Sequence, residues 1–144
     1  MPFALGARSL ARLDGVHPRL VAVVKRAIEI SPQDFLVLEG VRTPERQREL
    51  YAQGRTKPGA KVTWTLTSNH FKRAETGYGH AVDLCPYPVD WNTASKFDAI
   101  YRAMMQAGDE LDTPIRSGMD WDRDGKLREK GEHDSPHFEL WGVK

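Results

Sequence analysis

Apolar residues recur at helical spacing in two long segments of the chain. Residues 17–30 are predicted to form an amphipathic helix that opens with Pro18, a residue favoured in the first turn. A second amphipathic helix is predicted from residue 92 to Gly108. The apolar faces that these two helices contribute to a core contain Leu20, Val21, Val23, Val24, Ala27, Ile28, Phe97, Ile100, Tyr101, Met104 and Met105.

Shorter signals complete the set of predicted elements. Thr43 and Pro44 provide a cap and a first helical position, so a further helix is expected over residues 43–54. Apolar runs bounded by polar or glycine residues predict strands over residues 34–39, 62–67, 80–84, 114–116 and 137–141. Because helices and strands intermix without regular β-α-β alternation, we expect an α+β fold with about three helices and a small, mainly antiparallel sheet.

Length and charge narrow the class of protein. With 144 residues, 40% of them hydrophobic, the chain suits a single domain over residues 1–144. The 21 basic and 20 acidic residues leave a formal net charge of +1, which does not favour a nucleic-acid partner. Cys85 is the single cysteine, so no internal disulfide is expected. No segment has the apolar length of a signal peptide or a membrane span, so we expect a cytoplasmic protein without membrane insertion.

Two parts of the sequence carry the residue types of a hydrolytic metal site. A catalytic zinc ion takes three protein ligands and leaves a position for water, and a neighbouring carboxylate can accept the proton of that water. The candidate zinc ligands are His70, Asp83 and His137. Asp134 is the candidate base, because a turn at residues 134–137 would place it beside the ion. Adjacent strands would bring His70 and Asp83 together.

Other histidines compete for these roles. His80 lies three residues before Asp83, and in a strand the two side chains point to opposite faces, so only one can face the site. His133 would support a ligand or be solvated, and His17 suits a structural role at the start of a helix. A histidine or aspartate taken alone is usually a hydrogen-bonded structural residue. Spacing therefore leaves both a metal site and a purely structural interpretation open.

Residues 120–125 reproduce the first half of a calcium-binding loop. The oxygen donors expected at its first, third and fifth positions are Asp120, Asp122 and Asp124. Gly125 follows, where such a loop needs a sharp turn, but Gly131 replaces the glutamate of its last position. The segment is therefore either a calcium site or a solvated acidic turn with Trp121 packed under it.

Three motifs in fixed order extend this picture. They are Glu39-Gly-Val-Arg42-Thr-x-Glu45, then Ser68-x-His70 with Gly79-x-Ala-Val-Asp83-Leu84, and finally Asp134-x-Pro-His137-Phe-Glu-Leu140. From about Leu10 to Trp141 the chain resembles phage endolysins among the D-alanyl-D-alanine carboxypeptidase-like zinc peptidases, especially the L-alanyl-D-glutamate endopeptidases. This resemblance implies the LAS-type zinc peptidase fold.

The resemblance also implies roles for single residues. His70, Asp83 and His137 fall on the zinc ligands and Asp134 on the catalytic carboxylate. Arg42 falls on an arginine that would stabilise the oxyanion, with a salt bridge to a helix glutamate as the structural alternative. Ser68 would orient the substrate or simply end a strand. The insertion at residues 71–78 is longer than in many relatives, and it would line the substrate groove or close over it.

These features predict a zinc-dependent peptidoglycan hydrolase, an endolysin that cuts the stem peptide between L-alanine and D-glutamate and lyses bacterial cell walls. A D-alanyl-D-alanine carboxypeptidase or dipeptidase would use the same metal chemistry. A non-catalytic cell-wall or calcium-binding module is the alternative of a different class. Some relatives use calcium as an activator, so Ca²⁺ joins Zn²⁺ as an expected cofactor. The resemblance further implies a monomer made in the host cytoplasm that reaches the wall through a holin-type release partner.

Overall fold

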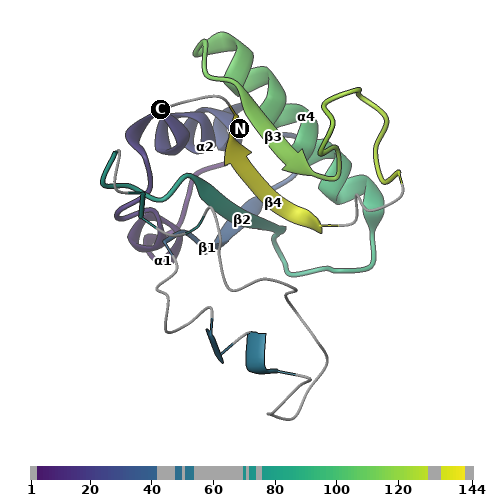
Figure 1. Cartoon of the computed structure of the whole chain (residues 1–144). Coiled ribbons are helices and arrows are strands. Elements are labelled where there is room, and N and C mark those ends of the chain that lie inside the picture. Colours follow the sequence, from purple (N-terminus) through teal and green to yellow (C-terminus); the bar gives the residue numbers. More distant parts are fainter. Residues whose placement is uncertain are drawn as a thin grey trace.

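The computed structural model describes residues 3–41, 48–49, 51–53, 70, 72–73, 76–129 and 134–141. Within them, four strands form one antiparallel sheet in the order β1-β2-β4-β3 (Figure 1). The strands are β1 (Phe35–Glu39), β2 (Ala81–Pro86), β3 (Ile115–Gly118) and β4 (Asp134–Leu140). The helices are α1 (Ala7–Arg12), α2 (Pro18–Ile30) and α4 (Ala94–Glu110). The expected α+β fold with a small antiparallel sheet is confirmed.

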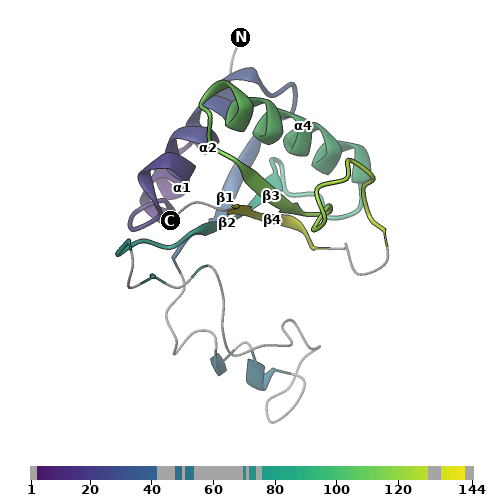
Figure 2. The ribbon, with the colours of Figure 1, turned by 45° about the horizontal axis from the view of Figure 1, so that its top comes forward.

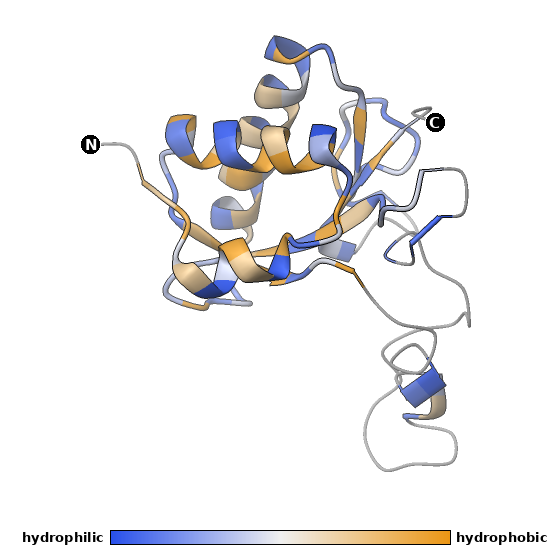
Figure 3. Ribbon diagram, turned by 90° about the vertical axis from the view of Figure 1, so that its left-hand side faces the viewer, coloured by the Kyte–Doolittle hydropathy of each residue, from blue (hydrophilic) through white to orange (hydrophobic). Residues whose placement is uncertain are grey.

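Helices α2 and α4 lie together over one face of the sheet (Figure 2). Hydrophobic and hydrophilic residues alternate around both helices, so each turns one apolar side toward the sheet (Figure 3). The strand residues in this core are Phe35, Val37, Val82, Leu84, Ile115, Phe138 and Leu140. Because side chains alternate along a strand, Asp83 and His137 point to the opposite face. The helices therefore support the sheet from one side and leave the other for the site.

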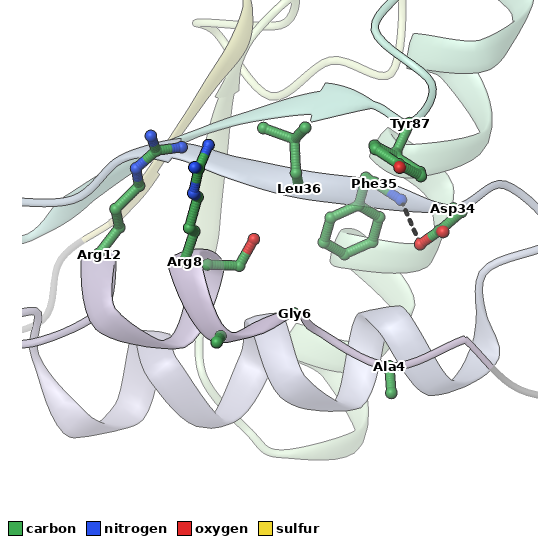
Figure 4. A pocket seen from close by; sticks show the side chains of 10 residues that line it. Ala4, Gly6, Arg8, Arg12, Asp34, Phe35, Leu36 and Tyr87 are labelled. Atoms are coloured by element: carbon green, nitrogen blue, oxygen red, sulfur yellow. Dashed lines mark hydrogen bonds between the residues drawn. The ribbon is translucent and has the colours of Figure 1, made fainter.

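Helix α1 covers the outer edge of β1. An edge strand presents backbone N–H and C=O groups that need partners. Here Ser9 Oγ accepts a hydrogen bond from the Val37 N–H at 3.0 Å, and Arg12 donates one to the Val37 carbonyl at 2.9 Å. Figure 4 shows Arg8 beside Arg12 in the cavity between α1 and β1, about 510 Å³ in volume. The sequence pattern does not predict α1, because its six residues are too few to show a periodicity.

The observed elements otherwise agree with the predicted ones, with shifts at their ends. The largest shift is in β4, which begins at Asp134 instead of residue 137. Of the helix predicted over residues 43–54, residues 48, 49 and 51–53 are described, and all of these except Gln53 are helical. The strand predicted over residues 62–67 lies outside the described residues. No helix in the described part of the chain combines the length and apolarity needed to cross a bilayer.

Candidate active site

Asp83 lies at the centre of a group of three side chains on the face of the sheet opposite α2 and α4. It is paired with His137 across β2 and β4, and its Oδ1 lies 3.4 Å from His137 Nδ1. The same oxygen lies 3.3 Å from His70 Nε2. The two imidazole rings meet edge to face, with their centroids 5.2 Å apart. One ligand atom from each residue lies within 4.8 Å of the other two, so the fold brings together the three predicted zinc ligands.

Each imidazole is held through the nitrogen that faces away from Asp83. His70 Nδ1 lies 2.7 Å from the Gly40 carbonyl oxygen, and His137 Nε2 lies 2.7 Å from Glu139 Oε1. Both partners are acceptors, so these two nitrogens carry the N–H and donate it. A histidine that binds a metal ion commonly has its second nitrogen anchored in this way. The anchored rings thus direct their other nitrogens toward the Asp83 carboxylate.

Burial disfavours the charged forms of Asp83 and His137, but the attraction between these two groups outweighs the effect of burial. Burial raises the pKa of Asp83, yet the hydrogen bonds from His137 and His70 outweigh it and hold that pKa well below its usual range. Burial lowers the pKa of His137, yet hydrogen bonds with Asp83 and Glu139 raise it to about 9. The metal-free pair is therefore an ionised carboxylate beside a protonated imidazole, and a divalent cation could take the place of the His137 proton.

Asp134 stands beside this group because β4 bulges. Ser117 pairs with Phe138, but the next residue, Gly118, pairs with Asp134, so the register between β3 and β4 shifts at this point and β4 carries extra residues there. Asp134 Oδ2 thereby lies 4.0 Å from His137 Nδ1 while its side chain stays 53% exposed. A Cβ atom on Gly118 would lie 2.0 Å from the Asp134 carbonyl oxygen, so the bulge requires glycine there.

One local expectation is wrong, although the residues meet as expected. Residues 134–137 do not form a turn but begin β4, and it is the bulge that brings Asp134 and His137 to one side. His70 lies in a turn, and the strand expected to lead into it lies outside the described residues. An isolated bridge between Lys72 and Gly79 returns the chain from that turn to the start of β2.

His80 and His17 lie together away from the three-residue group. His80 Nε2 is 2.8 Å from Thr76 Oγ1, and its ring centroid is 5.2 Å from that of His17. Because Thr76 belongs to the polar insertion, buried His80 attaches this insertion to the start of β2. His17 Nδ1 accepts a hydrogen bond from the Arg19 N–H at the start of α2, in the structural role expected of it.

Three residues that the sequence analysis considered are not described by the structure, and one residue near the site was not considered in the sequence analysis. Arg42, Ser68 and His133 lie outside the described residues. The sequence argument does not include Glu139, the buried partner of His137. Its signal was present in the motif His-Phe-Glu, because residues two apart in a strand share a face.

The acidic loop that follows β3 has the shape of a cation site. Ligand oxygens of Asp120, Asp122 and Asp124 lie within 4.8 Å of one another. Asp120 is buried, and its Oδ2 accepts hydrogen bonds from the Gly125 N–H and the Tyr101 hydroxyl at 2.9 and 3.1 Å. Burial raises the pKa of Tyr101 to about 12, aided by the hydrogen bond to Asp120. Gly125 has a φ of 81°, the conformation expected for the sharp turn.

Comparison with known proteins shows the family to which the chain belongs. Residues 1–141 match the family described as phage L-alanyl-D-glutamate peptidase. The chain belongs to this family. It is 34% identical to the L-alanyl-D-glutamate peptidase of Escherichia phage T5, over 97% of this chain and 99% of that protein. It also resembles the crystal structure of the Serratia marcescens L-Ala D-Glu endopeptidase ChiX, with a TM-score of 0.71, 33% identity, and 94% and 87% of the two chains covered.

Membership in the phage L-alanyl-D-glutamate peptidase family makes the chain a peptidase and a peptidoglycan hydrolase. The expected family and enzyme class are therefore confirmed, and the non-catalytic alternative is not favoured. The His70, Asp83 and His137 group also fits a metal ion by its chemistry. Two anchored imidazoles and one carboxylate form a donor set of the kind that binds zinc in hydrolytic sites.

Proposed function

We propose that the protein is a zinc-dependent L-alanyl-D-glutamate endopeptidase in which His70, Asp83 and His137 hold the ion and Asp134 is the catalytic base. The observation that carries this proposal is the convergence of the three donor atoms within 4.8 Å, with Asp134 exposed beside them. Three protein ligands leave a coordination position for water or substrate. The family relationship supports the choice of the L-Ala–D-Glu bond over a terminal D-alanine.

A zinc ion at this site would polarise the scissile carbonyl and lower the pKa of the attacking water. The protein supplies the proton transfers. Asp134 accepts a proton from the water as it attacks the carbonyl carbon, and it returns this proton to the nitrogen of D-glutamate as the C–N bond breaks. Its 53% exposed side chain and its place 4.0 Å from His137 Nδ1 suit a group that must meet both water and substrate.

Two further residues complete the proposed site on the strength of the family motifs. Arg42 would donate hydrogen bonds to the oxygen that becomes negatively charged in the tetrahedral intermediate. Ser68 would orient the stem peptide. Gly40 lies two residues before Arg42 in the sequence, and its carbonyl accepts the hydrogen bond from His70 Nδ1.

A cavity of about 370 Å³ adjoins the β4 bulge and offers a place for part of the substrate. Its walls are Trp91, Asn92, Ala94, Phe97, Arg128, Ser135 and Pro136. Trp91 is 54% exposed and its ring stacks on Phe97, with 5.9 Å between the centroids. An exposed ring held rigidly in this way suits contact with a sugar or an apolar peptide side chain. Trp91→Ala should raise KM for peptidoglycan more than it lowers kcat.

The acidic loop is proposed to bind calcium as a second, structural ion. Its support is the cluster of three carboxylates around Gly125, in the order that a calcium-binding loop uses. Asp120 already gathers backbone and Tyr101 donors, so the loop has a defined shape into which the exposed Asp122 and Asp124 side chains project oxygens. The protein is further proposed to act as a monomer that is made in the host bacterial cytoplasm and needs a holin-type partner to reach the wall.

The test of the catalytic proposal combines elemental analysis with product identification. The purified wild type should hold one zinc ion per chain, and mass spectrometry of digested wall peptides should show new ends at L-alanine and D-glutamate. Loss of a single terminal D-alanine would instead establish the carboxypeptidase. Digestion of walls by protein that holds no zinc would reject the metal-dependent mechanism.

A further inference from the structure

Glu139 lies buried between a proposed metal ligand and an arginine. Its side chain is 6% exposed, and its two carboxylate oxygens have different partners. Oε1 accepts a hydrogen bond from His137 Nε2 at 2.7 Å, and Oε2 accepts one from the Arg116 guanidinium at 2.8 Å. A buried carboxylate is costly unless it is paired in this way. Arg116 therefore stabilises the charge of the group that holds His137.

The sheet register explains why these residues meet. His137 and Glu139 are two positions apart in β4, so their side chains share a face of the sheet. Asp83 is the cross-strand partner of His137 in β2, and Arg116 is the cross-strand partner of Glu139 in β3. Asp83, His137, Glu139 and Arg116 therefore form a row across three neighbouring strands. Each side chain in the row contacts the next one.

Trp121, in the acidic loop, packs against two residues of this row. Its ring centroid lies 5.2 Å from that of His137, and the Arg116 guanidinium lies 5.1 Å from its ring centroid. Arg116 also donates a hydrogen bond to the Trp121 carbonyl oxygen at 3.4 Å. The expectation that Trp121 packs under the acidic turn is thus refined, because its ring contacts His137 and Arg116. The imidazole of His137 is restrained both at its Nε2 atom and across its ring.

We propose that Glu139 and Arg116 are positioning residues that orient His137 as a zinc ligand. Glu139 accepts a hydrogen bond from the Nε2–H group and so leaves the lone pair on Nδ1, the atom 3.4 Å from Asp83 Oδ1. Arg116 acts through Glu139 because its hydrogen bond to Oε2 fixes the rotamer of that carboxylate. The inference rests on the proposed zinc site, and it assigns neither residue a contact with the substrate.

The test measures zinc affinity by competition with a chelating indicator, in protein whose fold is checked by circular dichroism. Glu139→Gln should bind zinc about 10- to 100-fold more weakly, the usual effect of removing such an outer partner. Arg116→Ala should weaken binding up to about tenfold, and the double variant should be no worse than Glu139→Gln alone, because one residue acts through the other. Cobalt(II) substituted for zinc should show a shifted visible absorption spectrum in Glu139→Gln.

Glu110→Gln is the matched control, because Glu110 is also paired with an arginine, Arg26, but far from the metal site. It should leave zinc affinity and the cobalt spectrum unchanged. If Glu139→Gln does not fold, Arg116→Ala carries the test, since the Arg116 side chain is 30% exposed and its loss is milder. Zinc binding within about twofold of wild type in the folded variants would overturn the inference. A wild type that binds no zinc would instead overturn the proposed function.

Discussion

Asp83 and His137 face one another across β2 and β4, with 3.4 Å between Oδ1 and Nδ1. Antiparallel pairing places the side chains of directly opposed residues close together, so the register alone is enough to create this contact. The contact has two uses. It forms an ion pair when His137 is protonated, and it provides two ligand atoms when a cation displaces that proton.

The stability of the metal-free protein should fall at alkaline pH. The folded-state pKa of His137 is raised to about 9, above the ordinary value of 6.5, so its contribution is complete below pH 6.5 and disappears as the pH rises through 9. A shift of this size corresponds to roughly 3 kcal/mol of unfolding free energy. Melting of chelator-treated protein between pH 6 and 9.5 measures it, and zinc-loaded protein serves as the comparison. Equal melting temperatures across this range in the metal-free protein would contradict the ion pair.

Replacement of Asp134 should separate catalysis from metal binding. Asp134→Asn keeps the size of the side chain but cannot accept the proton of the attacking water, so kcat for wall lysis should fall about 10²- to 10⁴-fold. Zinc content should stay at the wild-type level, because Asp134 stands outside the three-ligand group. Elemental analysis and a turbidity assay on the same preparation check both statements. A fully lytic Asp134→Asn enzyme would remove this residue from its assigned role.

Gly118→Ala should displace Asp134 without removing a single catalytic atom. The added methyl group would lie 2.0 Å from the Asp134 carbonyl oxygen and 2.7 Å from its Cβ, so the bulge must shift. We expect a loss of about 1–3 kcal/mol in unfolding free energy and a marked drop in kcat. Gly6→Ala is the control, because a Cβ at Gly6 meets nothing within 4 Å. Chemical denaturation and lysis assays measure the two effects. Wild-type kcat in Gly118→Ala would show that this close contact does not set the position of Asp134.

Calcium should stabilise the protein through the acidic loop. Titration into zinc-loaded protein should raise the melting temperature and the rate of lysis, since the ion would pair with carboxylates that otherwise repel one another. Asp122→Ala removes an exposed oxygen donor and should abolish most of the response, while Asp109→Ala on α4 should retain it. If wild-type melting and activity stay constant throughout the titration, the loop is only an acidic turn.

Ser9→Ala should destabilise the protein by removing a hydrogen bond between α1 and the edge strand β1. The Val37 N–H donates to Ser9 Oγ in a buried hydrogen bond, and its loss leaves that donor without this acceptor. We expect a decrease of about 1–3 kcal/mol in unfolding free energy. Ser95→Ala, at an exposed position of α4, controls for the change in helix propensity. Urea denaturation compares the two variants, and an equal effect would mean that α1 does not stabilise β1 through this bond.

The residues of the candidate site could be predicted because they lie in short sequence motifs. His70, Asp83, Asp134 and His137 were candidates by residue type and order, and the family resemblance implied their roles. The contrast between His80 and Asp83 also followed from the alternation of side chains along a strand, and the structure places His80 against Thr76 and His17. The periodicity of α2 and α4 was strong enough to identify the core helices and their buried faces.

The sequence by itself thus determined the donor types, the two long helices and the alternating strands, since these depend on neighbours a few residues apart. Only the tertiary structure decided the pairing of Asp83 with His137, the bulge opposite Gly118 and the row through Glu139 to Arg116. Each of these depends on the register between strands that lie far apart in the chain. A shift of one residue in that register would turn every side chain to the other face, and no local pattern specifies it alone.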